Sequence, residues 1–334
     1  MLRKIDWESQ IGRRLKLRDL HVFSTVVQRG SMAKAARHLG VSHPAVSEVI
    51  ADLEHALEVR LLDRSARGIE PTIYGDALLK RSVAVFDELK QSIRDIEFLS
   101  DAATGEVRIG CHEAPWFTLL PDVIRRFAQE YPRIQVHTDL IDHSEAFLAL
   151  RERSYDCVLI PIRMALHDKA AADDLTVEIL YDDAHIVAAW VHSKWARRRK
   201  IDLAELIDEP WIFVGPSSWN RPWSDEIFQA RGLSRPEPLV TTDSIVLRAR
   251  LVAAGPCLGL FATTVLRRLI ADNYAITALS VDLHPKALSI GIVTLKTRTL
   301  SPVVERFLEC IREVAASLDG KPRRRALART SKSS

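Results

Sequence analysis

Residues 17–57 contain three short helical patterns separated by two breaks, and this spacing constrains the fold more than any other feature. The first pattern has apolar residues at intervals of three and four and ends at Gly30, a residue type common just after a helix. Ser31 is a suitable N-cap for a second, alanine-rich helix, and Ser42 for a third. Two short helices joined by a turn at Gly40 predict a helix-turn-helix.

The N-terminal end of the third helix is expected to face outward. Its exposed side carries His43, Ser47 and Glu48, and Pro44 is tolerated in its first turn, where a missing N–H costs little. This third helix is the second helix of the helix-turn-helix motif, and in such motifs its N-terminal end reaches base edges in the major groove. The pattern therefore favours binding to duplex DNA.

A two-stranded wing is expected after the third helix. Between Leu57 and Thr72, short apolar stretches flank a basic turn that contains glycine. Arg64 and Arg67 would project from this turn toward phosphates or the minor groove.

A long helix is expected to begin after Thr72, its N-cap. Its later apolar residues are spaced three, four and three apart, an a/d seam of period 3.5, at Phe86, Leu89, Ile93 and Ile96. A helix packed only on its own domain has a broader apolar face. The seam predicts a dimerising helix, which ends in a short hinge at 102–105.

The rest of the chain alternates strand and helix patterns. The first block has strands at 107–110, 134–140 and 157–160 and helices at 121–131 and 144–153, an order that implies a parallel sheet with right-handed crossovers. The second block has strands at 186–190, 211–214, 239–241 and 258–261 and helices at 222–231, 244–254 and 265–272. A strand at 288–293 is expected to rejoin the first block, and a helix at 302–316 to close it. Two lobes linked by crossing strands predict a ligand cleft between them.

These patterns divide the chain into five parts. We expect an N-terminal extension (1–16), a winged helix-turn-helix (17–72), a linker helix with its hinge (73–104), a two-lobed α/β domain (105–318) and a basic disordered tail (319–334). Lobe I takes about 105–183 and 281–318, and lobe II about 184–280.

Composition excludes several classes of protein. Hydrophobic residues make up 47% and charged residues 27%, with no apolar run long enough for a membrane span and no secretory signal, so we expect a cytoplasmic protein. Its four cysteines form no C-x-x-C pair, which favours buried free thiols. The net charge of +3 depends on six basic residues from Lys321 onward, and without them 41 basic residues face 44 acidic ones. Bulk charge therefore gives no argument for DNA binding.

The motifs and their order resemble the LysR-type transcriptional regulators. The similarity rests on 17–23, 30–47, 61–64, 71–75, 105–110, Leu120–Pro121 and 252–255, and it covers about residues 15–315. It implies a winged helix-turn-helix on a linker helix, followed by an effector domain like a periplasmic binding protein. It also implies homodimers or dimers of dimers (homotetramers) that bind inverted-repeat DNA operators and respond to a small-molecule inducer, with RNA polymerase as a further partner.

The resemblance also assigns site residues. Ser31 matches a phosphate-contacting cap, Ser42, Pro44 and Ser47 match the start of the recognition helix, and Arg64 and Arg67 match the wing. His43 replaces the family's usual glutamine, and Glu48 a polar or basic residue, so the target sequence is left open. The implied effector contacts are Cys111, His112, Glu113, Pro161, Ser217, Ser218, Trp219, Thr242, Asp243 and Phe261. Cys111 stands where many relatives have serine or threonine.

Other functions remain as alternatives. The sequence has no dinucleotide, phosphate-loop, nucleophile-elbow or H-E-x-x-H motif, and His112–Glu113 lacks a partner histidine, so no enzyme, metal or cofactor is expected. A small-molecule receptor with only non-specific DNA affinity is the main alternative. An architectural DNA binder would be more basic and would not need two lobes.

Overall fold

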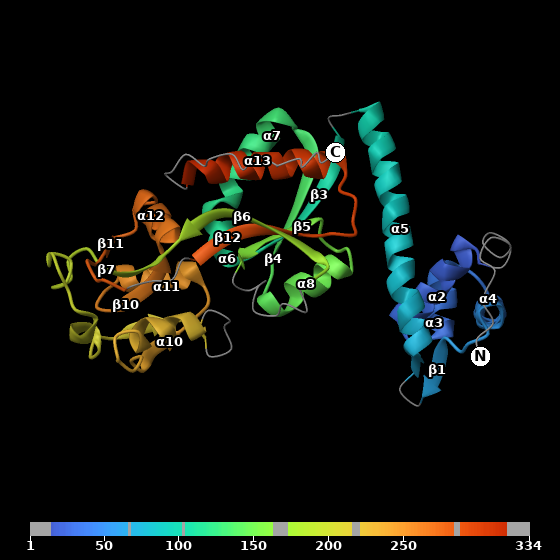
Figure 1. Cartoon of the computed structure of the whole chain (residues 1–334), viewed down its shortest axis with the longest axis horizontal. Helices are drawn as coiled ribbons and strands as arrows, with labels where there is room; N and C mark the ends of the chain where they lie inside the picture. Colours follow the sequence, from blue (N-terminus) through green and yellow to red (C-terminus); the bar gives the residue numbers. More distant parts are fainter. Residues whose placement is uncertain are drawn as a thin grey trace, which may run out of the picture. The chain divides into compact units, whose positions relative to one another are not determined.

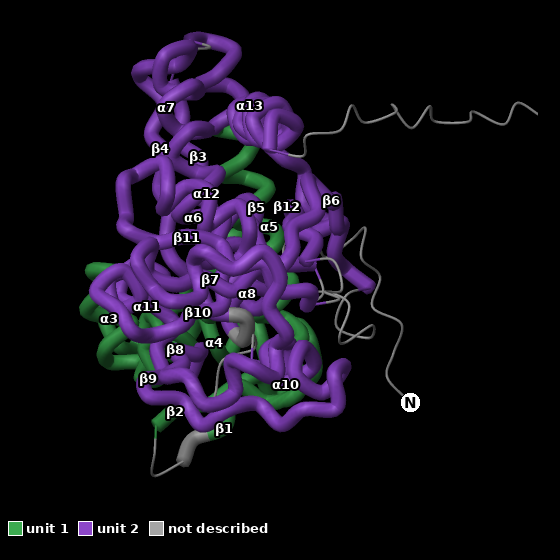
Figure 2. The backbone as a smooth tube through the Cα atoms, turned by 90° about the vertical axis from the view of Figure 1, so that its left-hand side faces the viewer, with its two compact units in different colours: residues 1–93 green, residues 94–334 purple. Residues whose placement is uncertain are grey.

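The computed structural model describes residues 15–65, 68–101, 104–162, 173–215, 221–283 and 288–318. Arg67, Ser217, Ser218, Trp219 and the basic tail lie outside them. The chain divides into two compact units, Met1–Ile93 and Arg94–Ser334 (Figure 2), and each is described by itself. No helix in the described part is long and apolar enough to cross a membrane.

The first unit is a small helical domain with a hairpin. It contains α2 (Leu17–Arg29), α3 (Met32–Leu39), α4 (His43–Leu57), β1 (Leu62–Ser65), β2 (Gly68–Pro71) and the first part of α5 (Ile73–Ser100). The core gathers side chains from all three short helices, among them Phe23, Val26, Ala35, Ala36, Val46, Ile50 and Leu53. The predicted helix-turn-helix and wing are therefore present.

The breaks between these helices follow the predicted chemistry. Gly30 and Gly40 end α2 and α3 with φ of 61° and 68°, a left-handed conformation that costs glycine little. The side chains of Ser31 and Ser42 accept hydrogen bonds from backbone N–H groups in the first turns of α3 and α4. Thr72 does the same for α5, since its Oγ1 accepts from the N–H of Gly75 at 3.1 Å.

Lobe I is built on a five-stranded sheet in the order β4-β3-β5-β12-β6. Its strands are β3 (Thr104–Cys111), β4 (Arg133–Leu140), β5 (Cys157–Pro161), β6 (Leu175–Asp183) and β12 (Leu288–Leu295). Its helices are α6 (Glu113–Thr118), α7 (Leu120–Glu130), α8 (His143–Arg151) and α13 (Pro302–Leu318). Helices α7 and α13 cover one face, and α8 the other (Figure 1).

Lobe II is built on a second five-stranded sheet, in the order β11-β7-β10-β8-β9. Its strands are β7 (His185–Trp190), β8 (Trp211–Phe213), β9 (Pro238–Thr241), β10 (Leu258–Ala262) and β11 (Ile276–Ala278). One face packs with the 3-10 helix η2 (Leu203–Leu206) and α10 (Arg221–Gln229), and the other with α11 (Ile245–Ala253) and α12 (Thr263–Ala271).

Helices cover both faces of each sheet, so the side chains that alternate along an inner strand enter two separate cores. In β5, Cys157 and Leu159 join the core under α7 and α13, whereas Val158 and Ile160 join the core over α8. Continuous apolar strands such as these are typical of sheets with helices on each side. All four cysteines are free and buried, as the sequence predicted.

The structure confirms the predicted parallel order of the first three strands of lobe I and adds two antiparallel pairings. Strands β3, β4 and β5 are parallel, but β12 is antiparallel to β5, so the sheet is mixed. The edge strand β6 was not predicted. It pairs antiparallel with β12 along its whole length, with a bulge at Ile290–Gly291.

Candidate functional site

The wing is fixed to the helix-turn-helix by hydrogen bonds that its backbone N–H groups donate. The Glu54 carboxylate of α4 accepts from the N–H groups of Leu61 and Leu62, at 2.7 and 3.2 Å. The N–H of Ile69 in β2 donates to the carbonyl of Gly30 at 3.1 Å. A Cβ on Gly68 would lie 2.9 Å from that carbonyl, which explains why glycine stands there. The hairpin is thereby held to both α4 and the end of α2.

The start of α4 presents polar side chains to solvent. Ser42, His43, Pro44 and Glu48 are exposed, and the N-terminus of the helix adds a partial positive charge. Ser47 differs from them, because its half-buried hydroxyl donates to Met32 Sδ at 3.3 Å. Ser31 is partly buried and caps α3. Arg64 lies in β1, but its side chain is outside the described part, as is the whole of Arg67.

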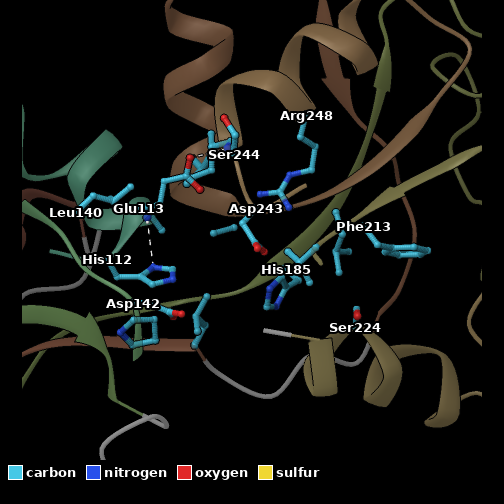
Figure 3. Close-up of a pocket in the computed structure, with 18 of the residues that line it drawn as sticks. His112, Glu113, Leu140, Asp142, His185, Phe213, Ser224, Asp243, Ser244 and Arg248 are labelled. Carbon is cyan, nitrogen blue, oxygen red and sulfur yellow. Dashed lines mark hydrogen bonds between the residues drawn. The ribbon is translucent and has the colours of Figure 1, made fainter. Parts of the chain in front are cut away.

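A cavity of about 470 Å³ lies between the two lobes of the second unit (Figure 3). Lobe I contributes residues at or just after the carboxyl ends of three neighbouring strands, β3, β4 and β5. Lobe II contributes the start of β7, the end of β8 and the first turn of α11. Parallel strands gather their carboxyl ends at one edge of a sheet, which is the usual position of a ligand site in such folds.

One hydrogen bond crosses this cavity from lobe to lobe. Glu113, in the first turn of α6, accepts from the N–H of Ile245 at the start of α11, at 2.6 Å. The same end of α11 is capped within lobe II by Ser244, whose Oγ accepts from Leu247. Burial raises the pKa of Glu113 against the lowering effects of the Ile245 hydrogen bond and of Arg248. The contact therefore depends on a costly buried carboxyl and on the relative position of the lobes.

Arg248 and His185 are the basic groups of lobe II in the cavity wall. Arg248 is only 7% exposed and lies over the Phe261 ring, 4.9 Å from its centroid. Burial lowers its pKa, although Glu113 and Asp243 act in the opposite direction. Burial, reinforced by Arg248, lowers the pKa of His185 from 6.5 to about 4, so its ring is neutral near pH 7. Trp223 packs edge-on against the same ring, with centroids 5.4 Å apart.

Four of the predicted effector residues are brought together here, namely His112, Glu113, Pro161 and Asp243. Cys111 is fully buried, with its thiol directed at the carbonyl of His112 at 3.4 Å, and it does not line the cavity. Phe261 is buried beneath Arg248, and the Thr242 Oγ1 accepts from the N–H of Ser244. Ser217, Ser218 and Trp219 lie outside the described residues.

Sequence reasoning missed several wall residues, including Asp142, His185, Ser224 and Arg248. For Arg248 a signal existed: it falls on the apolar face of α11, between the buried Ile245 and Val252. A charged residue on the buried face of a helix indicates a special role. The described residues contain no group of three His, Cys, Asp or Glu that could hold a metal ion.

Family models match both parts of the chain. The model described as the LysR substrate binding domain matches residues 100–316. The model described as a bacterial regulatory helix-turn-helix protein of the lysR family matches residues 17–76. The chain belongs to the LysR family of transcriptional regulators. It therefore combines a helix-turn-helix for DNA with an effector-binding domain.

Curated relatives and solved structures agree with this membership. The chain is 28% identical over 311 residues to the HTH-type transcriptional regulator GbpR of Azospirillum brasilense, which covers 93% of this chain and 89% of GbpR. It is 30% identical over 240 residues to TdcA of Escherichia coli, which covers 71% and 74% of the two chains. A full-length OxyR variant from Pseudomonas aeruginosa has the same fold, with a TM-score of 0.62, 17% identity and coverage of 90% and 95%. Full-length CbnR in complex with its target DNA has a TM-score of 0.52 and 21% sequence identity. The match covers 90% of this chain and 100% of CbnR.

Proposed function

We propose that this LysR-family regulator binds an inverted-repeat operator as a dimer or a dimer of dimers, and that a small inducer in the lobe cavity changes that binding. The observation that carries the proposal is the hydrogen bond from the N–H of Ile245 to Glu113 across the cavity. A ligand seated there contacts both lobes, so its binding energy differs between lobe arrangements. That difference is what a regulatory ligand needs in order to shift a population.

The proposed DNA contacts are at the exposed start of α4 and in the wing. His43, Ser47 and Glu48 would reach base edges, while Ser31, Ser42 and Pro44 would position the helix on the DNA backbone. Arg64 and Arg67 would contact phosphates or the minor groove. On this basis residues 17–72 form the DNA-binding domain and 105–318 the effector domain.

Dimerisation is assigned to α5. Leu89, Ile93, Ile96 and Leu99 are 43%, 58%, 63% and 84% exposed in the single chain. Leu89, Ile93 and Ile96 belong to the predicted seam of period 3.5, so a second copy of the helix would bury them. The pairing would set the distance between half-sites. RNA polymerase is proposed as a further partner. The proposed location of both proteins is the cytoplasm, where the operator lies.

The test is a DNase footprint of the full chain on the DNA upstream of its own gene, with random competitor DNA at two salt concentrations. We expect a two-part protected site that resists the competitor. His43→Ala is expected to reduce the ratio of specific to random binding by roughly 5- to 100-fold, the value of one base contact. His55→Ala is the matched control, because His55 is an exposed histidine in the last turn of the same helix.

Loss of all protection in the presence of competitor would contradict the proposal. It would instead favour the alternative, a small-molecule receptor with only non-specific DNA affinity. An unchanged specificity ratio in His43→Ala would reject His43 as a base-reading residue while leaving the footprint intact.

A further inference from the structure

Arg248 is a buried cation for which the described residues provide no ion pair. It is 93% buried, given its exposure of 7%, and its Nε has no hydrogen-bond partner. No described carboxylate lies within 4 Å of its guanidinium, and its contact is instead the face of Phe261. Burying a charge without a partner is costly, so such a group in a core is rare.

The guanidinium is directed into the cavity, not into the protein interior. Arg248 belongs to the cavity wall, and Figure 3 shows its side chain extending from α11 toward the side lined by Asp243 and His185. Its five N–H donors form a fork that matches a carboxylate. A cavity of about 470 Å³ is within the range of ~300–1,000 Å³ typical of small-molecule sites.

The surrounding charges restrict the ligand further. Glu113, Asp142 and Asp243 also line the cavity, and the nearest of them to Arg248 partly offset its positive potential. A ligand with two or more negative charges, such as a phosphate, would be repelled by these carboxylates. The same carboxylates accept hydrogen bonds from hydroxyl or ammonium groups, and apolar residues such as Phe213 and Leu260 complete the wall.

We infer that the effector is a small monocarboxylate, bearing hydroxyl or ammonium donors, whose carboxylate pairs with the Arg248 guanidinium. The inference rests on the proposed function, since it names the chemistry of the inducer. Pairing would supply the missing counter-charge in a water-poor site, where a bidentate contact is strong. Arg248 lies one turn after Ile245, the residue whose N–H donates to Glu113. Binding at Arg248 would thus act on the same end of α11 that joins the lobes.

The experiment is a binding titration of the full chain without DNA, followed by tryptophan fluorescence and by the unfolding midpoint. Six of the seven tryptophans lie in the second unit, so the signal reports mainly on the effector domain. The probes are lactate, glycerate and gluconate as hydroxy acids and alanine and serine as amino acids. Each probe is compared with its primary amide, which keeps the size and loses the carboxylate.

We expect at least one acid to raise the midpoint by about 5–10 °C at a hundredfold excess over its Kd, with no effect of its amide. Arg248→Met should weaken that acid roughly 10- to 100-fold, and Arg248→Lys less. Arg250→Met is the matched control, because Arg250 is exposed on the same helix and does not line the cavity. Binding to the Arg250→Met variant should be unchanged.

Three results would overturn the inference. They are equal stabilisation by acid and amide, undiminished acid binding in Arg248→Met, and the absence of any shift with all five acids. Arg248→Lys keeps the charge, so it covers the case in which Arg248→Met fails to fold. Because no DNA is present, these results are separate from the footprint. An acid that binds but never alters the footprint would contradict the proposed regulation and leave only the carboxylate site at Arg248 standing.

Discussion

His185 is expected to make the stability of the effector domain depend on pH in a measurable way. Its folded-state pKa of about 4 lies below the ordinary value of 6.5, because burial and the nearby Arg248 disfavour the imidazolium. Between these two pH values the unfolded chain binds more protons than the folded chain. The free energy of unfolding therefore falls as the pH falls through this window.

The magnitude follows from the same two pKa values. One pKa unit corresponds to about 1.4 kcal/mol, so the titration of His185 alone should remove about 2.5 kcal/mol between pH 7.5 and pH 4.5. His185→Gln keeps a polar side chain of similar length and cannot become charged. The difference in unfolding free energy between the wild type and His185→Gln should thus shift by that amount across the range.

Urea unfolding at several pH values, followed by tryptophan fluorescence, gives this difference directly. Other titrating groups affect both proteins and cancel. His192→Gln is the control for replacing a histidine near this strand, since His192 is exposed in the turn that follows it. A His185→Gln curve that stayed parallel to the wild type within ~0.5 kcal/mol would refute the reasoning, because burial of the neutral ring would then have no linkage to pH.

Two further predictions concern packing and charge. Gly75→Ala should destabilise the first unit by about 3 kcal/mol, because a Cβ there would lie 2.1 Å from the Leu61 carbonyl oxygen. Thermal unfolding checks this, with Asp76→Ala at the neighbouring exposed position as the control. Equal unfolding midpoints for the two variants would contradict the prediction. Asp156→Asn should lower the unfolding free energy of the second unit by about 3 kcal/mol, because it removes the carboxylate 2.8 Å from the buried Arg298. Asp101→Asn breaks an exposed ion pair with Arg133 and should lower the unfolding free energy by less than ~1 kcal/mol in the same urea experiment. Similar losses in the two aspartate variants would disprove the second prediction.

Local chemistry was enough to predict the first unit. Gly30, Ser31, Ser42 and Thr72 each determine a helix end through their own backbone preference or side-chain cap, and all four act as predicted. Strand β6 was missed because its alternation is weak: its burial changes irregularly from Leu175 to Asp183, as is common at a sheet edge. Its place depends on pairing with β12, more than 100 residues later, and no local pattern records that pairing.

The candidate cavity divides in the same way. The resemblance named His112, Glu113, Pro161 and Asp243, and each of them follows a strand that the sequence predicts. His185 and Ser224 join the wall only because the two lobes face each other, which depends on long-range topology. The resemblance also named Cys111, but its side chain is fully buried in the core between the sheet of lobe I and helices α7 and α13. It therefore does not reach the cavity.

The place of β12 in its sheet has a consequence for synthesis on the ribosome. This strand, Leu288–Leu295, lies between β5 and β6, and α13 packs over the same sheet from the C-terminal end of the domain. All strands of lobe II are made before it. Lobe II can therefore complete its sheet while lobe I, begun more than 180 residues earlier, still lacks a central strand. Lobe I, whose first strand β3 directly follows α5, is therefore the last lobe to complete its sheet during translation.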